Sequence, residues 1–339
     1  MARPTLKSIS KRTGYSLTTI SRALKDGPEV KPETIAKVKA IAQELGYRPD
    51  PSGLRLRTGK TFVICAIIPV IPVIQPGQTV GDLGSLRLVK GLTEALKGTN
   101  YHLMVLPDSG TGDRMEDVRY VVESGIADGL ILNLTSTDDR RVRYLHEQKF
   151  PFITFGRTEL SFDHAFFDVD NIDFAYRASS ALYKKGRFNQ RIVVSDLSYS
   201  YCVHQWMGFK RAALEHGVEV NQQQHLIEEA KIPSYDELVV SMQSSDETVD
   251  GIIFPGEITC LGVLSSLQKR GKTIGKDIDL VTLENSHLVD FFGVPITSFH
   301  QDTLHVGNRL STMLLEQIDG KPAEDLQELV CTNLREAGV

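Results

Sequence analysis

The sequence predicts a small all-α domain built around a helix-turn-helix, followed by an α/β body of two doubly wound lobes. Positive charge is concentrated in the first 60 of the 339 residues. The same segment holds three short amphipathic patterns separated by turn residues. Beyond it, apolar runs alternate with longer amphipathic stretches, which is typical of parallel sheets with crossover helices.

Charge is segregated along the chain. Residues 1–60 contain 13 Lys and Arg against 5 Asp and Glu, a net charge of +8. The remaining residues contain 25 Lys and Arg against 38 Asp and Glu, a net charge of −13. A short basic segment joined to an acidic body indicates a nucleic-acid-binding domain attached to a domain with another role. An enzyme with a basic tail is the alternative at this point.

Composition excludes several protein classes. With 41% hydrophobic and 24% charged residues and no low-complexity tract, the chain is neither disordered nor collagen-like. Its longest apolar run, 62–74, contains two prolines and is too short to span a bilayer, so no membrane partner is expected. No apolar stretch follows the basic N-terminus as in a secretory signal, and we expect a cytoplasmic protein.

The first and third helices are expected from their apolar faces. Thr5 can cap a short helix that stops at Gly14. Another helix is expected to begin near Pro32 and to end before Gly46. The residues that share the inner faces of these two helices are Leu6, Ile9, Thr13, Ile35, Val38, Ala42 and Leu45.

The second helix, expected over 17–25 with Ser16 as its cap, carries the residues that could read DNA. In a helix-turn-helix the second helix lies in the major groove, and its first residues contact base edges. Arg22 can donate two hydrogen bonds to the O6 and N7 of guanine, whereas Thr18 and Leu17 suit hydroxyl or methyl contacts. A plain three-helix bundle with Arg22 as a solvated charge is the alternative. The residues expected on the outward face are Leu17, Thr18, Ser21 and Arg22.

The body is expected to form two α/β lobes, because about 280 residues exceed what one core usually holds. In such sheets, ligands bind at the carboxyl ends of the strands, and between two lobes they bind in the cleft. The expected strands are 62–68, 102–106, 129–133, 152–155, 192–195, 251–254 and 280–283. The expected helices are 83–96, 172–184, 204–215, 235–243, 259–270 and 303–317.

Three stretches of the N-terminal segment form a specific pattern. Residues 5–10, 14–24 and 45–49 read TLKSIS, GYSLTTISRAL and LGYRP. They resemble the headpiece of the lac repressor/galactose repressor family of bacterial transcription regulators. The body resembles the effector domain of that family, which is similar to a periplasmic sugar-binding protein. The matching stretches of the body read DGLILN at 128–133, FGR at 155–157, FDVDN at 167–171, GR at 186–187, MGF at 207–209 and TSFHQD at 297–302.

This resemblance implies a domain organisation and partners. It places the DNA-binding headpiece at 1–48, a hinge segment at 49–61, and an effector-binding and dimerisation domain at 62–339. The N-terminal lobe would take about 62–161 and 293–322, and the C-terminal lobe 162–292 and 323–339. The implied partners are a pseudo-palindromic DNA operator, a small-molecule effector and a second copy in a homodimer. Thr5, Ser16 and the outward face of the second helix would contact the DNA.

In the family, a hinge helix places a leucine in the minor groove at the operator centre, which bends the DNA. Leu56 occupies the position of that leucine. The usual alanine-rich hinge is replaced here by DPSGL at 50–54, in which Gly53 disfavours an isolated helix. Leu54 therefore stays open as the alternative wedge.

Effector contacts carried over from the family fall on residues that can pair with adjacent hydroxyls, namely Asn133, Arg157, Asp170, Gln205 and Glu284. Phe162 or Trp206 could supply an apolar face against a sugar ring. The alternatives are that Asn133 caps a strand end, Arg157 bridges the lobes and Trp206 belongs to the core.

Two positions depart from the family pattern. Gln205 stands where an arginine is usual, and Glu284 where an aspartate is usual. Losing a charged donor makes an anionic effector less suitable, so a neutral sugar or glycoside that acts as an inducer is the preferred interpretation. A purine acting as corepressor is the alternative.

Enzyme chemistry finds little support in the motifs. The sequence lacks GxSxG, HExxH and a GxGxxG after the first strand, and its nine histidines show no metal-ligand spacing. The stretch GLRLRTGKT at 53–61 departs from a phosphate-binding loop, because five residues separate its glycines instead of four. We therefore expect no catalytic residues, no metal and no cofactor.

Overall fold

Helices α1 (Leu6–Thr13), α2 (Leu17–Ala23) and α3 (Pro32–Glu44) pack around one small core in the computed structural model. The structure describes residues 4–47, 55, 58–69, 83–108, 113–243 and 248–335. Thr5 precedes α1, and Gly14 ends it in the left-handed conformation with φ of 77°. The expected inner faces are confirmed, since the buried core consists of Ile9, Ile20, Ala23, Val38 and Ala42.

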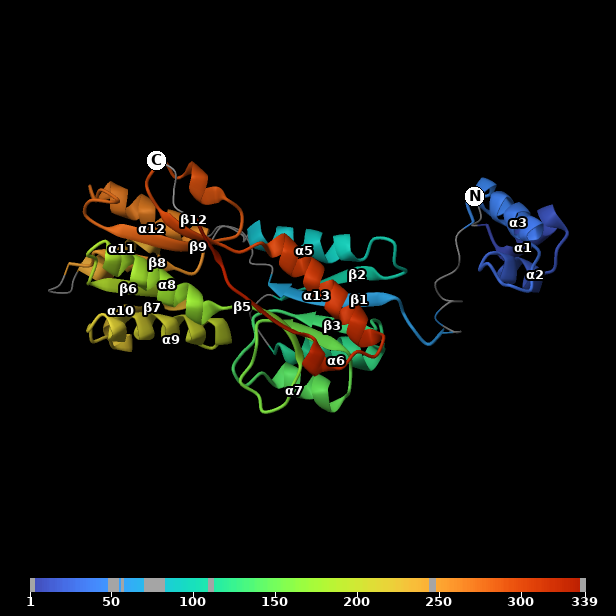
Figure 1. Cartoon of the computed structure of the whole chain (residues 1–339), viewed down its shortest axis with the longest axis horizontal. Helices are drawn as coiled ribbons and strands as arrows, with labels where there is room; N and C mark the ends of the chain where they lie inside the picture. The colour runs from blue at the N-terminus through green and yellow to red at the C-terminus, as the bar shows by residue number, and fades with distance from the viewer. Residues whose placement is uncertain are drawn as a thin grey trace. The chain divides into compact units, whose positions relative to one another are not determined.

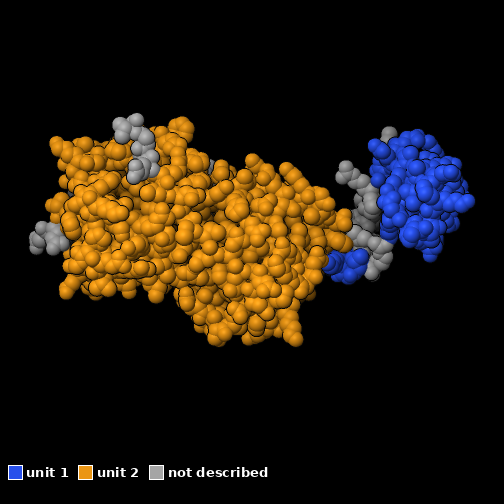
Figure 2. Space-filling view, in the orientation of Figure 1, with its two compact units in different colours: residues 1–61 blue, residues 62–339 orange. Residues whose placement is uncertain are grey.

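The chain divides into two compact units, Met1–Thr61 and Phe62–Val339 (Figure 2). Within the second unit, the described residues form two sheets, each of six strands. This arrangement confirms the predicted α/β body with two lobes.

The first sheet has the order β11-β5-β4-β3-β1-β2, and all its neighbouring strands are parallel. Strand β1, next to the edge strand β2, is buried on both faces: Ile64, Ala66 and Ile68 point to one helical layer, and Cys65 and Ile67 to the other. The strands are β1 (Val63–Pro69), β2 (His102–Asp108), β3 (Gly129–Leu132), β4 (Phe152–Phe155), β5 (Ala165–Val169) and β11 (Gln327–Val330).

The second sheet has the order β12-β10-β9-β8-β6-β7. It is parallel except at one edge, where β12 runs antiparallel to β10. The strands are β6 (Gln190–Val194), β7 (Leu226–Glu228), β8 (Gly251–Phe254), β9 (Asp279–Glu284), β10 (Thr297–His300) and β12 (Asn333–Arg335).

Helices cover both faces of each sheet (Figure 1). On the first sheet, α5 (Leu83–Ala95) and α13 (Thr303–Ile318) form one layer, and α6 (Met115–Ser124) and α7 (Arg140–Glu147) form the other. On the second, α8 (Asn171–Lys184) and α9 (Ser200–Glu215) lie opposite α11 (Tyr235–Gln243) and α12 (Glu257–Lys269). The short helix α10 (Gln222–His225) precedes β7. No helix within the described ranges has the length and apolar character needed to cross a bilayer.

The lobe boundaries expected from the resemblance differ from these sheets. β5 pairs with β4, so the first sheet extends to Val169 rather than ending near 161. β10 pairs with β9, so 297–300 belongs to the second sheet, and β11 returns to the first. The chain therefore crosses between the lobes immediately after β5, after β10 and between β11 and β12. Each crossing comes at a strand end, where backbone pairing stops.

Every strand and helix expected in the body is present, most of them with shifted ends, but other elements were missed. β7 and β12 have three residues each, and β11 alternates exposed with half-buried positions, so they carry little apolar signal. α7 buries only three side chains, one of them Arg141, which hides its helical periodicity.

Two glycines allow helices to cross at close range. A Cβ at Gly91 of α5 would lie 2.1 Å from the carbonyl oxygen of Leu304 in α13. A Cβ at Gly208 of α9 would lie 2.1 Å from the carbonyl oxygen of Ile172 in α8. In these contacts backbone meets backbone, so no flexible side chain can move aside, and each helix pair needs glycine at its crossing.

Replacing Gly91 with Ala is expected to lower the free energy of unfolding by about 1–3 kcal/mol, because α5 must move away from α13. Chemical denaturation followed by circular dichroism measures the change. Gly256→Ser is the matched control, since its Cβ would have nothing within 4 Å and serine suits its helix N-cap position. The prediction would be contradicted if wild type and Gly91→Ala unfolded at the same midpoint concentration of denaturant.

Candidate functional site

The outward face of α2 is available for contacts with another molecule. Ser16 caps the helix by accepting a hydrogen bond from the backbone N–H of Thr19 at 3.1 Å. Leu17 is 42% exposed, Thr18 and Arg22 are exposed, and Ser21 is half-buried. Thr5, at the start of α1, is also exposed. The packing of Ile20 and Ala23 in the core fixes which side of α2 faces outward.

Arg22 forms an ion pair within the headpiece. Its Nε lies 3.1 Å from Oε1 of Glu29, and the two side chains are 57% and 47% exposed. A pair this exposed adds little stability, so Arg22 can exchange Glu29 for another partner at small cost. The hinge residues Gly53, Leu54 and Leu56 lie outside the described residues.

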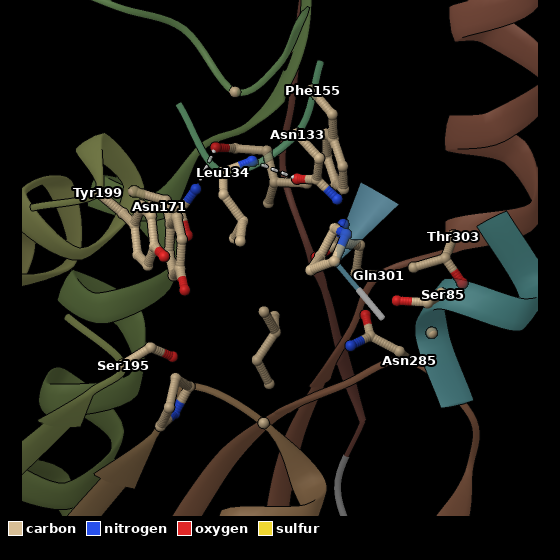
Figure 3. Close-up of a pocket in the computed structure, with 18 of the residues that line it drawn as sticks. Ser85, Asn133, Leu134, Phe155, Asn171, Ser195, Tyr199, Asn285, Gln301 and Thr303 are labelled. Atoms are coloured by element: carbon tan, nitrogen blue, oxygen red, sulfur yellow. Dashed lines mark hydrogen bonds between the residues drawn. The ribbon is translucent and has the colours of Figure 1, made fainter. Parts of the chain in front are cut away.

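A cavity of about 360 Å³ lies between the two sheets of the second unit (Figure 3). Its lining comes from the carboxyl ends of strands in both lobes. Asn133 and Phe155 belong to the ends of β3 and β4 in the first lobe. Asn285 and Gln301 follow β9 and β10. The expected position of a ligand site, at the carboxyl edges and between the lobes, is thus where a cavity is found.

Amide and hydroxyl groups dominate the polar lining. They come from Ser85, Asn133, Asn171, Ser195, Tyr199, Tyr201, Gln205, Thr259, Asn285, Gln301 and Thr303. Three of these side chains carry a buried oxygen without a hydrogen-bond partner among the described residues: Gln205 Oε1, Asn285 Oδ1 and Thr303 Oγ1. Buried polar atoms need partners, so these oxygens favour a ligand rich in hydrogen-bond donors.

The charged lining is entirely acidic. Asp108, Asp168, Glu229 and Glu257 contribute to it, and the described lining includes no Lys, Arg or His. Asp108 pairs with Arg114 at 3.0 Å, and Glu257 accepts hydrogen bonds from the loop at Ser286. A cavity of this charge repels an anionic ligand and suits a neutral one.

Asp168 is the most buried of these carboxyls. Burial raises its pKa to about 7, and Arg157, whose Nη1 lies 3.5 Å from its Oδ2, opposes the increase. At neutral pH the group can therefore act as donor or acceptor toward a ligand.

Two arginines hold the turn that carries Asn133. Arg114 and Arg141 each donate to the carbonyl oxygens of Asn133 and Leu134, at 3.0–3.2 Å. Leu134 has φ of 52°, a conformation that is uncommon for a leucine. The Asn133 carboxamide oxygen accepts from the Leu134 N–H at 2.7 Å, which directs the rest of the amide to the cavity (Figure 3).

The lobes also touch directly beside the cavity. Thr135, after β3, and Ser200, at the start of α9, are buried and share a hydroxyl contact of 2.9 Å. The N–H of Ser200 donates to the carbonyl oxygen of Thr135 at 2.8 Å. His204 Nε2 lies 2.8 Å from Oε1 of Glu159 across the same boundary. These contacts join the two lobes on one side of the cavity.

Of the seven effector residues expected from the resemblance, Asn133 and Gln205 line the cavity. Gln205 is buried and donates to Oδ1 of Asn171 at 3.0 Å. Arg157 is not part of the lining, and it pairs with Asp168, which is. Asp170 caps α8 by accepting from the N–H of Asp173 at 2.9 Å, so its carboxylate is committed to the helix.

Phe162, Trp206 and Glu284 also lie outside the lining. Phe162 stacks on His146 with ring centroids 3.9 Å apart. Trp206 packs against Phe209 in the core of the second lobe, as the alternative interpretation had it. Glu284 is fully buried and pairs with Arg335. In each case local packing or pairing occupies the side chain that was expected to meet a ligand.

Sequence reasoning missed most of the lining. Asn285 follows Glu284 directly, and Asn171 and Gln301 lie at the lobe crossings after β5 and β10. Only their position could have indicated that these residues line a cavity, because each follows the end of a strand in a parallel sheet. Because β5 and β10 were not predicted as strands, two of these positions could not be recognised.

The chain matches two family models over nearly its whole length. Residues 74–334 match periplasmic binding proteins and the sugar binding domain of the LacI family, and residues 5–50 match the LacI family of bacterial regulatory proteins. The chain belongs to the LacI family. It is a transcription regulator with a helix-turn-helix and a sugar-binding domain, and it is not an enzyme.

Individual LacI-family proteins align end to end with it. The transcriptional regulator RafR of Escherichia coli is 29% identical over 324 residues, which cover 95% of this chain and 94% of RafR. A lac repressor dimer bound to operator and the anti-inducer ONPF superposes with a TM-score of 0.82 at 15% identity, covering 99% and 98% of the two chains. A complex of the regulator CelR with cellobiose superposes with a TM-score of 0.68 at 22% identity, covering 99% of this chain and 100% of CelR. At these identities the solved structures show the shared fold alone.

Replacing Asp168 with Asn is expected to flatten the pH dependence of stability. The raised pKa means that the folded chain keeps a proton that the unfolded chain loses above the unfolded value of 3.8. The stabilisation is therefore complete below that value and is lost as pH rises toward 7. Wild type should lose roughly 2–4 kcal/mol of unfolding free energy through this group over that range, and Asp168→Asn should not.

Chemical denaturation of both proteins at several pH values between about 4 and 8 measures this difference. Asp138→Asn is the control, because its side chain is 71% exposed and its profile should run parallel to wild type. A parallel profile for Asp168→Asn as well would contradict the assignment.

Proposed function

We propose that this regulator is a homodimeric repressor whose operator affinity falls when a neutral sugar or glycoside binds in the cavity between its lobes. The observation that carries the proposal is the lining, which combines many amide and hydroxyl groups with carboxylates and no cationic side chain among the described residues. Neutral polyols are recognised by this kind of lining, because each hydroxyl both donates and accepts hydrogen bonds. The complex of CelR with cellobiose shows that a relative of this fold holds a disaccharide.

DNA recognition in this proposal uses the exposed face of α2. Two headpieces of a dimer would enter successive major grooves of a pseudo-palindromic site, with Arg22 as a base reader. The hinge segment 49–61 would contact the operator centre, with Leu56 as the wedge and Leu54 as the alternative. The basic charge of the first 60 residues supplies the phosphate attraction that all such sites need.

Coupling between the two sites would run through the arrangement of the lobes. A ligand that contacts both carboxyl edges favours one lobe arrangement over another, and only such a differential affinity can shift an equilibrium. The buried contact from Thr135 to Ser200 and the partly exposed one from Glu159 to His204 belong to the arrangement described here and would have to adjust. A coupling free energy of about 1–3 kcal/mol would change operator affinity by roughly 5–150-fold.

The decisive experiment selects operator DNA from random sequence with the full chain and then measures its release. Fluorescence anisotropy on the selected DNA is repeated with neutral mono- and disaccharides, glycosides, sugar phosphates and purines. Release by a neutral sugar, and not by its phosphate, is expected. Tighter binding in the presence of a purine would overturn the proposal in favour of a corepressor-dependent regulator.

Replacing Arg22 with Ala is expected to lower operator affinity by about 1–3 kcal/mol and to relax the preference at one base position. Binding to a set of operators mutated singly at each position measures both effects. Lys39→Ala is the matched control, because Lys39 is also an exposed headpiece cation paired with an acid, Asp26. Loss of affinity without relaxed preference would remove Arg22 from the base-reading residues.

Replacing Gln205 with Met is expected to weaken sugar binding about three- to tenfold, because one net hydrogen bond contributes about 1 ± 0.5 kcal/mol. Operator affinity without sugar should stay unchanged. Calorimetry with the releasing sugar measures the effect. Phe162→Leu, outside the lining, is the control. An unchanged dissociation constant for Gln205→Met would count against this cavity as the sugar site.

A further inference from the structure

A second polar cluster lies beside the cavity at the carboxyl ends of β9 and β10. Glu284, His287 and His300 each place one ligand-type atom within 4.8 Å of the other two. Nδ1 of His287 and Nδ1 of His300 both lie 3.6 Å from Oε1 of Glu284. The two imidazole rings stack with centroids 4.4 Å apart and an interplanar angle of 14°, so one ring has to turn before both nitrogens can face a single ion. The spacing of these residues in the sequence gave no reason to group them, and the fold of the second sheet brings them together.

The distances suit a small transition-metal ion. Zinc is bound by histidine nitrogen and carboxylate oxygen at about 2.0–2.2 Å, so neighbouring ligand atoms in a tetrahedral site lie roughly 3.4 Å apart. The two pairs at 3.6 Å are close to this value. One carboxylate and two neutral imidazoles form a donor set that zinc accepts in proteins.

Unsatisfied buried atoms point to the same place. Within the described residues, Glu284 Oε2 and His300 Nδ1 have no hydrogen-bond partner. Glu284 is 0% exposed, and the His300 side chain is 13% exposed. Buried polar atoms need a partner. A cation or a solvent molecule would supply one for the carboxylate oxygen and for the imidazole nitrogen that faces it.

Arg335 on β12 supplies the positive charge in the arrangement described here. Its Nη1 contacts Oε1 of Glu284 and lies 2.6 Å from Nδ1 of His287, and its Nη2 lies 3.1 Å from Oδ1 of Asp290. Asp290 is 53% exposed, so it offers Arg335 a partner nearer the surface. The guanidinium thus occupies the space next to two of the three ligand atoms.

We propose that Glu284, His287 and His300 form a divalent metal site, of the type that zinc occupies, in which the ion competes with Arg335 for the same carboxylate. When the ion binds, Arg335 keeps its contact with Asp290 and releases Glu284. The site lies beside the cavity, because Asn285 and Gln301, the next residues after Glu284 and His300, both line it. The backbone N–H of Gln301 also donates to the carbonyl oxygen of Glu284 at 2.9 Å.

Titration calorimetry of the full chain, free of any affinity tag, with zinc chloride near neutral pH tests the proposal. One ion per chain is expected. His287→Asn and His300→Gln should each weaken binding by about 100-fold or more, beyond the roughly 10–100-fold that loss of an outer-shell partner causes. Asn suits position 287, since its backbone φ of 61° is one that asparagine tolerates.

The variant Arg335→Gln is expected to change the zinc affinity in the opposite direction. This distinguishes the proposed site from adventitious zinc binding to surface histidines. Removing the competing guanidinium should tighten zinc binding about tenfold or more, by analogy with other neighbours that tune metal sites. His102→Ala, which removes an exposed histidine of the first sheet, should leave the affinity unchanged. Thermal melting without metal checks that each variant is folded.

Three results would overturn the proposal. These are the absence of zinc binding by wild type, an equal affinity in the two histidine variants, and an affinity that does not rise in Arg335→Gln. Since none of these measurements uses DNA or sugar, they are independent of the proposed function.

Discussion

The structure of the second unit depends on one constraint, that parallel strands end at a common edge and that two such edges face each other. At a strand end the backbone leaves the ladder, and the side chains that follow are free to point away from the sheet. Asn133, Asn285 and Gln301 take this position in three different strands. Their amides converge although they lie far apart in the sequence, and the cavity is polar for this reason.

The lobe crossings share the same edges, which links the cavity to the relative position of the lobes. The chain crosses after β5, after β10 and between β11 and β12, and residues at the first two crossings, Asn171 and Gln301, line the cavity. A ligand held there touches the segments about which the lobes would turn. The glycine contacts of α5 with α13 and of α8 with α9 lie within single lobes, so each lobe has a closely packed helix pair of its own.

Charge divides the molecule into parts that recognise different chemistry. The first 60 residues carry +8, whereas the described cavity lining is acidic and without cations. Beside that lining, Arg335 neutralises the charge of the buried Glu284. In our proposal, a metal ion bound by Glu284 and the two neighbouring histidines can take the place of the guanidinium. Buried carboxylates are stable only when paired, so the acidic cavity requires partners such as Arg114 and Arg157 around it.

The sequence by itself determined the helical headpiece and the α/β body, because these depend on local periodicity, on turn residues and on charge along the chain. The family followed from motif stretches that resemble the LacI family and from the match to its models. The family resemblance also pointed to Asn133 and Gln205, which line the cavity. Only the tertiary structure decided that Trp206 packs in a core, that Glu284 pairs with Arg335, and that short strands such as β10 carry the chain between lobes. These outcomes depend on contacts between residues far apart in the chain. Local sequence patterns do not show which distant residue a side chain contacts in the folded protein.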